Sequence, residues 1–198
     1  MILEVWVDKC YTPPGFEIHD NDLIVDVGAH IGTFSIYAAN RAKKGLVYSL
    51  EPVTDNFELL QHNIQLNRIT NVIPVKKAIT KYTGHREIFV QLGDTTMHSF
   101  YNPKGIARKM RVSTITLADF MRDYSIDHID FLKMDCEDTE YEILIGCSDR
   151  TLNRIRKISF ESHPRDGIYN QNMIAKFLKD KGFRVALDPS MNIVYASR

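Results

Sequence analysis

The chain has 198 residues, of which 44% are hydrophobic and 25% charged, and its 25 basic and 25 acidic residues give a formal net charge of zero. This composition excludes an intrinsically disordered protein and argues against a nucleic-acid reader, which usually has a basic excess. A chain of this length is expected to form one domain, residues 1–198. No apolar run approaches the ~20 residues of a membrane span. The three cysteines form no Cys-x-x-Cys pair, so we expect free thiols in the reducing cytoplasm.

Short buried apolar runs alternate with helical faces along the chain, a pattern typical of a layered α/β fold. Residues 1–20 are expected to form a strand and a loop that cover one edge of the sheet. The next strands are predicted at 23–27, 46–50, 72–75, 129–134 and 155–160. Helices are predicted to begin near Gly32, at Asp55 with Glu58 completing its cap, after Thr116, at the capping box Thr139-x-x-Glu142, and near Asn170.

The chain ends in two further predicted strands, 183–187 and 193–196, separated by five residues. Because a parallel crossover needs a dozen or more residues, these two strands should pair antiparallel. A mostly parallel seven-stranded sheet with helices on both faces and one reversed strand at its end is typical of the Rossmann-like class I methyltransferase fold. A plain dinucleotide-binding fold would be expected to end on parallel strands.

Residues 84–112 fit the alternation poorly. They contain one strand candidate, 86–90, followed by an irregular polar stretch up to Lys109. Long insertions of this kind are usually functional or mobile. We interpret this one as a flap on the substrate side, and a surface insertion without function is the alternative.

The segment 24–35, Ile-Val-Asp-Val-Gly-Ala-His-Ile-Gly-Thr-Phe-Ser, points to a nucleotide site. Gly28 and Gly32 lie in a turn between a strand and a helix, where glycine lets the backbone approach a ligand. A dinucleotide site has the pattern G-x-G-x-x-G, but Ala29 and His30 stand where its second glycine would fall. A loop that admits an amino-acid tail and a sulfonium, without a diphosphate, favours S-adenosylmethionine.

The second strand ends on Glu51, a carboxylate that can accept hydrogen bonds from both ribose hydroxyls. The alternative is a carboxylate favoured by the dipole of the following helix. Asp26 either holds the loop or binds the cofactor's ammonium group, and His30 is either a ligand or base, or a loop residue that faces solvent or packs on the cofactor. The predicted cofactor-binding residues are Asp26, Gly28, Ala29, His30, Gly32, Thr33, Phe34, Glu51 and Asp135, with Pro52, Ala78 and Ile79 placed to sandwich adenine.

Two later strand ends contain the predicted catalytic residues, because ligands of doubly wound sheets bind beyond the carboxyl ends of the strands. Lys133, Asp135 and Glu137 alternate with period two, so they should point to one side. Asp135 is predicted near the sulfonium, where it could accept the acceptor's proton; a structural salt-bridged cluster is the alternative. At the next strand end, His163 is predicted as general base, oriented by Glu161.

The sequence gives no tight spacing of metal ligands, so no metal is predicted. The alternative is a magnesium site that ionises a diol, with ligands drawn from Asp135, Glu137, Asp138, Glu161 and His163.

Three segments together, 25–35, Leu-Glu-Pro at 50–52 and Ile-Asp-Phe-Leu-Lys-Met-Asp-Cys-Glu at 129–137, resemble FkbM-type S-adenosylmethionine-dependent methyltransferases. The resemblance covers roughly residues 11–165 and implies methyl transfer, often to a hydroxyl oxygen of a sugar or polyketide-like acceptor. Asp138 and Thr139 stand where the family commonly has glycine and alanine, which bears on the identity of the small-molecule or carbohydrate acceptor. The alternatives are an RNA methyltransferase and a non-catalytic module that holds S-adenosylmethionine or an NAD-like nucleotide.

Overall fold

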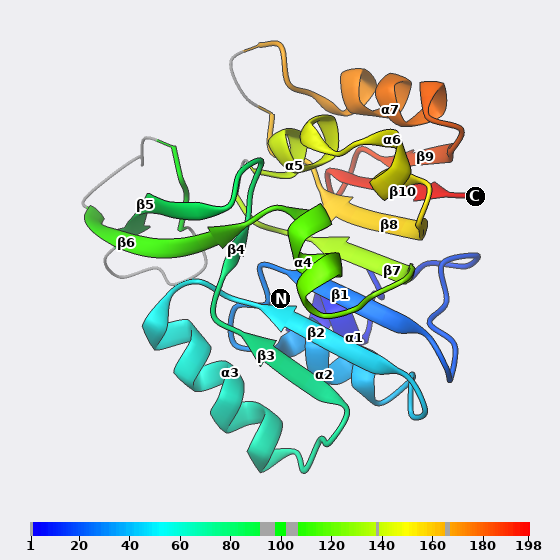
Figure 1. Cartoon of the computed structure of the whole chain (residues 1–198). Helices are drawn as coiled ribbons and strands as arrows, with labels where there is room; N and C mark the ends of the chain where they lie inside the picture. Colours follow the sequence, from blue (N-terminus) through cyan, green and yellow to red (C-terminus); the bar gives the residue numbers. More distant parts are fainter. Residues whose placement is uncertain (1, 92–97, 102–106, 138, 165–166) are drawn as a thin grey trace.

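The computed structural model describes residues 2–91, 98–101, 107–137, 139–164 and 167–198. Its larger sheet has seven strands in the order β3-β2-β1-β7-β8-β10-β9 (Figure 1). The strands are β1 (Leu23–Val27), β2 (Leu46–Leu50), β3 (Val72–Val75), β7 (Ile129–Met134), β8 (Ile155–Glu161), β9 (Arg184–Asp188) and β10 (Ile193–Ser197). Strand β10 runs antiparallel to both β8 and β9, and the other pairs are parallel. The predicted strands and the terminal hairpin are confirmed.

Helices cover both faces of this sheet. They are α1 (Ile2–Trp6), α2 (Thr33–Ala39), α3 (Thr54–Leu66), α4 (Leu117–Asp123), α5 (Glu140–Gly146), α6 (Asp149–Leu152) and α7 (Gln171–Asp180). Successive side chains of β1 point to opposite faces of the sheet and pack in the two hydrophobic cores there, as the period of two in a strand requires. Ile24 packs with Phe34 of α2 and Leu60 of α3, whereas Val25 packs with Phe120 of α4 and the α5–α7 side.

The predicted helix starts after Thr116 and near Asn170 are confirmed, and each has a side-chain cap. The side chain of Thr116 accepts a hydrogen bond from the backbone N–H of Asp119 at 3.0 Å, and Asn170 accepts one from Met173 at 3.0 Å. Each cap satisfies a backbone donor that the first turn of a helix leaves without an intrahelical partner. These two helix starts are therefore encoded locally.

The two predicted side-chain caps, Asp55 with Glu58 and Thr139 with Glu142, are wrong. Helix α3 begins at Thr54 with Val53 as its N-cap, so Asp55 lies inside the first turn. Thr139 does cap α5 by position, but its hydroxyl donates to the carbonyl of Cys136 at 2.8 Å, and Glu142 pairs with Arg86 at 2.7 Å. A local carbonyl therefore takes the Thr139 hydroxyl and a distant arginine takes Glu142, so the capping box does not form.

The N-terminal segment is a helix, so the predicted edge strand is wrong. Val5 of α1 is buried, and the ring of Trp6 packs edge-on against Tyr37 of α2 with 5.4 Å between centroids. Five residues are too few for the apolar pattern to distinguish a helix from a strand. Contact with α2 decides the conformation.

Part of the 84–112 insertion forms a second sheet with the order β4-β6-β5, made of β4 (Ala78–Ile79), β5 (Gly84–Gln91) and β6 (Ala107–Ile115). The prediction of an irregular stretch up to Lys109 is wrong for residues 107–109, because β6 begins at Ala107. Figure 1 places this sheet beside the carboxyl ends of β1, β2 and β7. The expected flap falls partly on residues 92–97 and 102–106, which lie outside the described residues.

Within the described ranges, no helix combines the length and the apolar composition needed to cross a lipid bilayer.

Candidate active site

A cavity of about 540 Å³ opens at the carboxyl ends of the parallel strands. Gly28, Glu51, Asp135 and Glu161, which follow or end β1, β2, β7 and β8, all line it, together with Tyr11 from the N-terminal segment. This volume falls within the range of small-molecule sites. The position is the one at which doubly wound sheets bind ligands.

The backbone conformation and the close packing of the β1–α2 turn require glycine at positions 28 and 32. Gly28 has φ 75°, and a Cβ there would lie 1.8 Å from the carbonyl oxygen of Asp135. Gly32 has φ 92°, and its Cβ would lie 2.6 Å from the Leu60 side chain. Only glycine therefore lets the turn after β1 lie against the segment that follows β7, which places the turn and Asp135 in one cavity.

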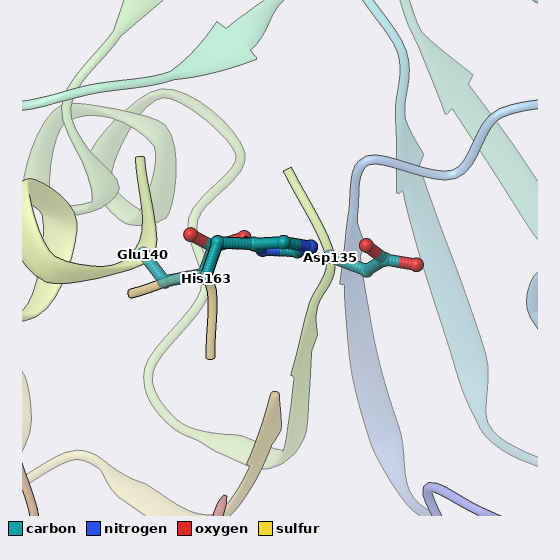
Figure 2. Close-up of side chains that lie close together, drawn as sticks. All are labelled: Asp135, Glu140 and His163. Carbon is teal, nitrogen blue, oxygen red and sulfur yellow. The ribbon is translucent and has the colours of Figure 1, made fainter. Parts of the chain in front are cut away.

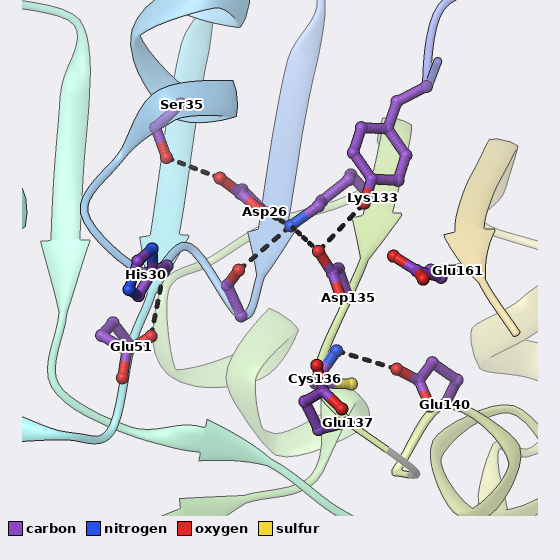
Figure 3. A network of polar contacts seen from close by, with 12 residues as sticks. Asp26, His30, Ser35, Glu51, Lys133, Asp135, Cys136, Glu137, Glu140 and Glu161 are labelled. Carbon is purple, nitrogen blue, oxygen red and sulfur yellow. Dashed lines mark hydrogen bonds and ion pairs between the residues drawn. The ribbon is translucent and has the colours of Figure 1, made fainter. Parts of the chain in front are cut away.

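Glu51 lines the cavity and lies beside His30 of the glycine turn (Figure 3). Its Oε2 accepts the backbone N–H of His30 and its Oε1 accepts that of Val53, both at 2.9 Å. Burial raises the pKa of Glu51 to about 7, although the two N–H donors and Lys133 oppose this shift. Each carboxylate oxygen has a further lone pair, so Glu51 can accept two ligand hydroxyls.

Asp26 and Lys133 form a buried ion pair with 3.0 Å between Oδ1 and Nζ (Figure 3). Asp26 has no exposed surface, and its Oδ2 accepts the hydroxyl of Ser35 at 2.6 Å. Lys133 also donates to the carbonyl of Gly28 at 3.0 Å, so it connects β1 to β7. The structure favours a loop-holding role for Asp26, and Lys133 lines a small recess next to the cavity. Removing either partner would leave a costly unpaired charge.

Asp135 lies between the glycine turn and Glu161 and faces the cavity (Figure 3). Its Oδ2 accepts the Tyr11 hydroxyl at 2.9 Å and is 3.9 Å from Nζ of Lys133. The predicted period of two does not continue to Glu137, because β7 ends at Met134 and Glu137 has φ 50°. Glu137 nevertheless lines the cavity, and burial raises its pKa to about 7.

His163 is surrounded by carboxylates. Its Nδ1 is 3.3 Å from Oε1 of Glu140, and its Nε2 is 3.7 Å from Glu137 and 3.6 Å from Glu161. Burial alone would lower the pKa of His163, but the hydrogen bond to Glu140 and the surrounding negative charges outweigh it and raise the pKa to about 10. A histidine protonated at neutral pH cannot accept a proton, so these surroundings disfavour the predicted role of His163 as general base.

Asp135, Glu140 and His163 place one donor atom each within 4.8 Å of one another (Figure 2). Glu140 was missed by sequence reasoning; it is fully buried at the start of α5 and accepts the backbone N–H of Cys136 at 2.8 Å. An imidazolium has no lone pair for a metal, and its charge already balances part of the negative charge of these carboxylates. Asp138, a member of the alternative magnesium set, lies outside the described residues.

The residues predicted to sandwich adenine are not the ones that line the cavity. Pro52, Ala78 and Ile79 do not line the cavity, and Ile79 lies in the large core on the α4 side. Val53 and Ile88 line it instead. They belong to the loop before α3 and to the second sheet, so no local pattern could have identified them.

The remaining predicted residues of the turn border a smaller recess of about 20 Å³ next to the main cavity. Ala29, Thr33 and Phe34 line this recess, together with Gly28 and His30. His30 and Gly28 also line the main cavity, so the turn contributes to both spaces. The structure thus brings five of the predicted turn residues to these two spaces, whereas Gly32 lines neither of them.

The sequence profile described as "Methyltransferase FkbM domain" matches residues 26–185. The chain is 26% identical to the 31-O-demethyl-FK506 methyltransferase FkbM of Streptomyces tacrolimicus, over 93% of this chain and 81% of the relative. It is 27% identical to the methyltransferase sdnD of Sordaria araneosa, over 93% of this chain and 82% of the relative.

Two solved structures have a similar fold. The crystal structure of methyltransferase FkbM from Methylobacillus flagellatus has a TM-score of 0.61 at 19% identity; the match covers 91% of this chain and 44% of that chain. A SAM dependent methyltransferase from Aquifex aeolicus has a TM-score of 0.55 at 15% identity, covering 98% and 90%. The predicted Rossmann-like class I methyltransferase fold is confirmed.

Proposed function

The chain belongs to the FkbM methyltransferase family, and we propose that it transfers the methyl group of S-adenosylmethionine to a hydroxyl oxygen of a small molecule or carbohydrate. The observation that supports this most directly is Glu51, buried beside the glycine turn with its carboxylate facing the cavity. The similarity to a relative named as an O-demethyl-FK506 methyltransferase supports a hydroxyl acceptor.

The residues present fit this cofactor. Glu51 would accept the ribose hydroxyls, Val53 and Ile88 would flank the base, and the turn from Gly28 would face the amino-acid part. Carboxylates at 51, 135, 137 and 161 line the same cavity. They would attract a sulfonium and repel the phosphates of a dinucleotide or an RNA, which disfavours both alternative functions.

The bound cofactor supplies a methyl group already activated by the sulfonium. The protein's part is alignment, exclusion of water and removal of one proton. As the bond from the acceptor oxygen to the methyl carbon forms, the carbon–sulfur bond breaks and the hydroxyl proton must leave. Glu161 is the proposed proton acceptor, because it lines the cavity together with Asp135, and burial and the charge of Asp135 raise its pKa above its usual value. Asp135, which faces Glu161, would hold the hydroxyl in line (Figure 3).

A methyl-transfer assay with sugars, phenols and RNA as acceptors tests this function. We expect S-adenosylhomocysteine and an O-methylated product with at least one hydroxyl-bearing small molecule, and no transfer to RNA. Transfer to RNA alone would overturn the proposed acceptor class. Absence of S-adenosylmethionine binding in equilibrium dialysis, with NAD as the comparison ligand, would overturn the cofactor.

The same assay has a chelation arm. Turnover is expected to persist after EDTA treatment, because the His163 imidazolium already neutralises the carboxylates that could bind a metal. Activity that is lost with EDTA and restored by Mg²⁺ would replace this account by a metal-assisted one.

Cofactor affinity should depend on pH through Glu51. The folded-state pKa of about 7 means that Glu51 gains a proton as the pH falls through 7, and a protonated carboxyl accepts hydroxyl donors less well. We expect the Kd for S-adenosylmethionine to rise about fivefold from pH 7 to pH 6, as one proton competes with binding. Calorimetry at both values measures this, and Glu51→Gln should flatten the dependence. An equal slope in that variant would assign the titration to another group.

A further inference from the structure

We propose that Tyr11 is a positioning residue for methyl transfer, and that it acts by holding the Asp135 carboxylate toward the acceptor. The inference rests on the proposed function. Tyr11 is 124 positions away from Asp135 in the sequence, yet its hydroxyl donates to Oδ2 at 2.9 Å, and both residues line the same cavity. The N-terminal segment therefore completes a site that is otherwise built from strand ends.

The backbone around Tyr11 is fixed on both sides. The carbonyl of Cys10 accepts the hydroxyl of Tyr195 from β10 at 2.5 Å, and the hydroxyl of Thr12 is 2.6 Å from that of Tyr37 on α2. All of these residues are buried. These two contacts anchor the backbone on either side of Tyr11, whereas the direct hydrogen bond to Oδ2 places its hydroxyl against Asp135. Losing one anchor leaves the other anchor and the direct bond in place, and such support keeps a reacting group in its productive geometry.

The surroundings of the Tyr11 ring also make its hydroxyl a donor. The ring packs edge-on against Phe34 at 5.6 Å, and Nζ of Lys133 lies 5.3 Å from its centroid. Burial and the charge of Asp135 raise the pKa of Tyr11 well above its usual value, so the hydroxyl keeps its proton. With Oδ2 engaged by Tyr11 and facing Lys133, Oδ1 of Asp135 is the oxygen assigned to the acceptor hydroxyl.

Tyr11→Phe removes this hydroxyl and keeps the ring. We expect kcat to fall about tenfold, as for loss of one hydrogen bond to a charged group, with the Kd for S-adenosylmethionine within about twofold of the parent. Tyr37→Phe is the matched control, because it removes another buried hydroxyl bonded to the same segment without touching Asp135. Its kcat should stay within about twofold. Equal losses of kcat in both variants would mean that Tyr11 merely anchors the segment, which would overturn the inference.

A double-mutant cycle with Asp135→Ala isolates the contact. In that background, Tyr11→Phe should change kcat by less than about twofold, and urea unfolding should show coupling between the two positions of about tenfold in the unfolding constant. Additive effects in both measurements would exclude action through Asp135. Because unfolding does not depend on turnover, a chain without methyl-transfer activity would overturn the proposed function, whereas lost coupling in an active chain would overturn only the role of Tyr11.

Discussion

Replacing Glu51 by alanine is expected to weaken S-adenosylmethionine binding about a hundredfold, because two ribose hydroxyls would lose a charged acceptor. The carboxylate is 5% exposed and is held by the backbone N–H groups of His30 and Val53, so no neighbouring side chain can take its place. At saturating cofactor, kcat should stay within about threefold of the parent, since binding to the ribose is the same in the ground state and the transition state. Isothermal titration calorimetry and a cofactor saturation curve measure the two quantities.

Glu87→Ala is the control for the loss of a carboxylate, because Glu87 pairs with Lys109 at 3.0 Å on the surface of the second sheet. That variant should bind the cofactor like the parent. Glu51→Gln should be intermediate, since an amide oxygen still accepts a hydrogen bond. Unchanged affinity in Glu51→Ala would remove Glu51 from the cofactor site.

Replacing Glu161 by glutamine is expected to lower kcat by ~10²–10⁴-fold, the usual contribution of a general base. The amide keeps the size of the side chain but cannot take the acceptor's proton. The Kd for S-adenosylmethionine should stay within about twofold of the parent, because Glu161 and Glu51 lie on opposite sides of Asp135 (Figure 3). Single-turnover rates with saturating cofactor separate the chemical step from product release.

Glu161→Asp and Asp180→Asn provide the comparisons for this experiment. The first keeps a carboxylate and should recover part of the rate, whereas the second removes a surface charge of α7 that pairs with Lys176 at 2.7 Å and should have no effect. Full activity of Glu161→Gln combined with loss of activity in Asp135→Asn would transfer the role of proton acceptor to Asp135.

The strands of the larger sheet, and the meeting of Gly28 and Glu51 in one cavity, could be predicted from the sequence because their signals are local. The strand at 23–27, the four-residue link before β10 and the helix starts at Thr116 and Asn170 depend on residues that are close together in the chain. Gly28 and Glu51 follow successive parallel strands, and parallel strands bring their carboxyl ends to the same edge. This is why the two residues could be placed in one cavity.

The acceptor half depends on contacts between distant parts of the chain. Tyr11 meets Asp135 because its neighbours Cys10 and Thr12 are held by Tyr195 and Tyr37. The pKa of His163 is raised because Glu140, Glu137 and Asp135 lie around it. Burial and electric charge are properties of the assembled environment, so residue type and spacing alone suggested a base where the fold forms a cation. The sequence by itself determined the strand positions, the terminal hairpin and the glycine turn, whose signals are local. The tertiary structure decided the strand order and the surroundings of Asp135, Glu161 and His163, because these depend on contacts between distant residues.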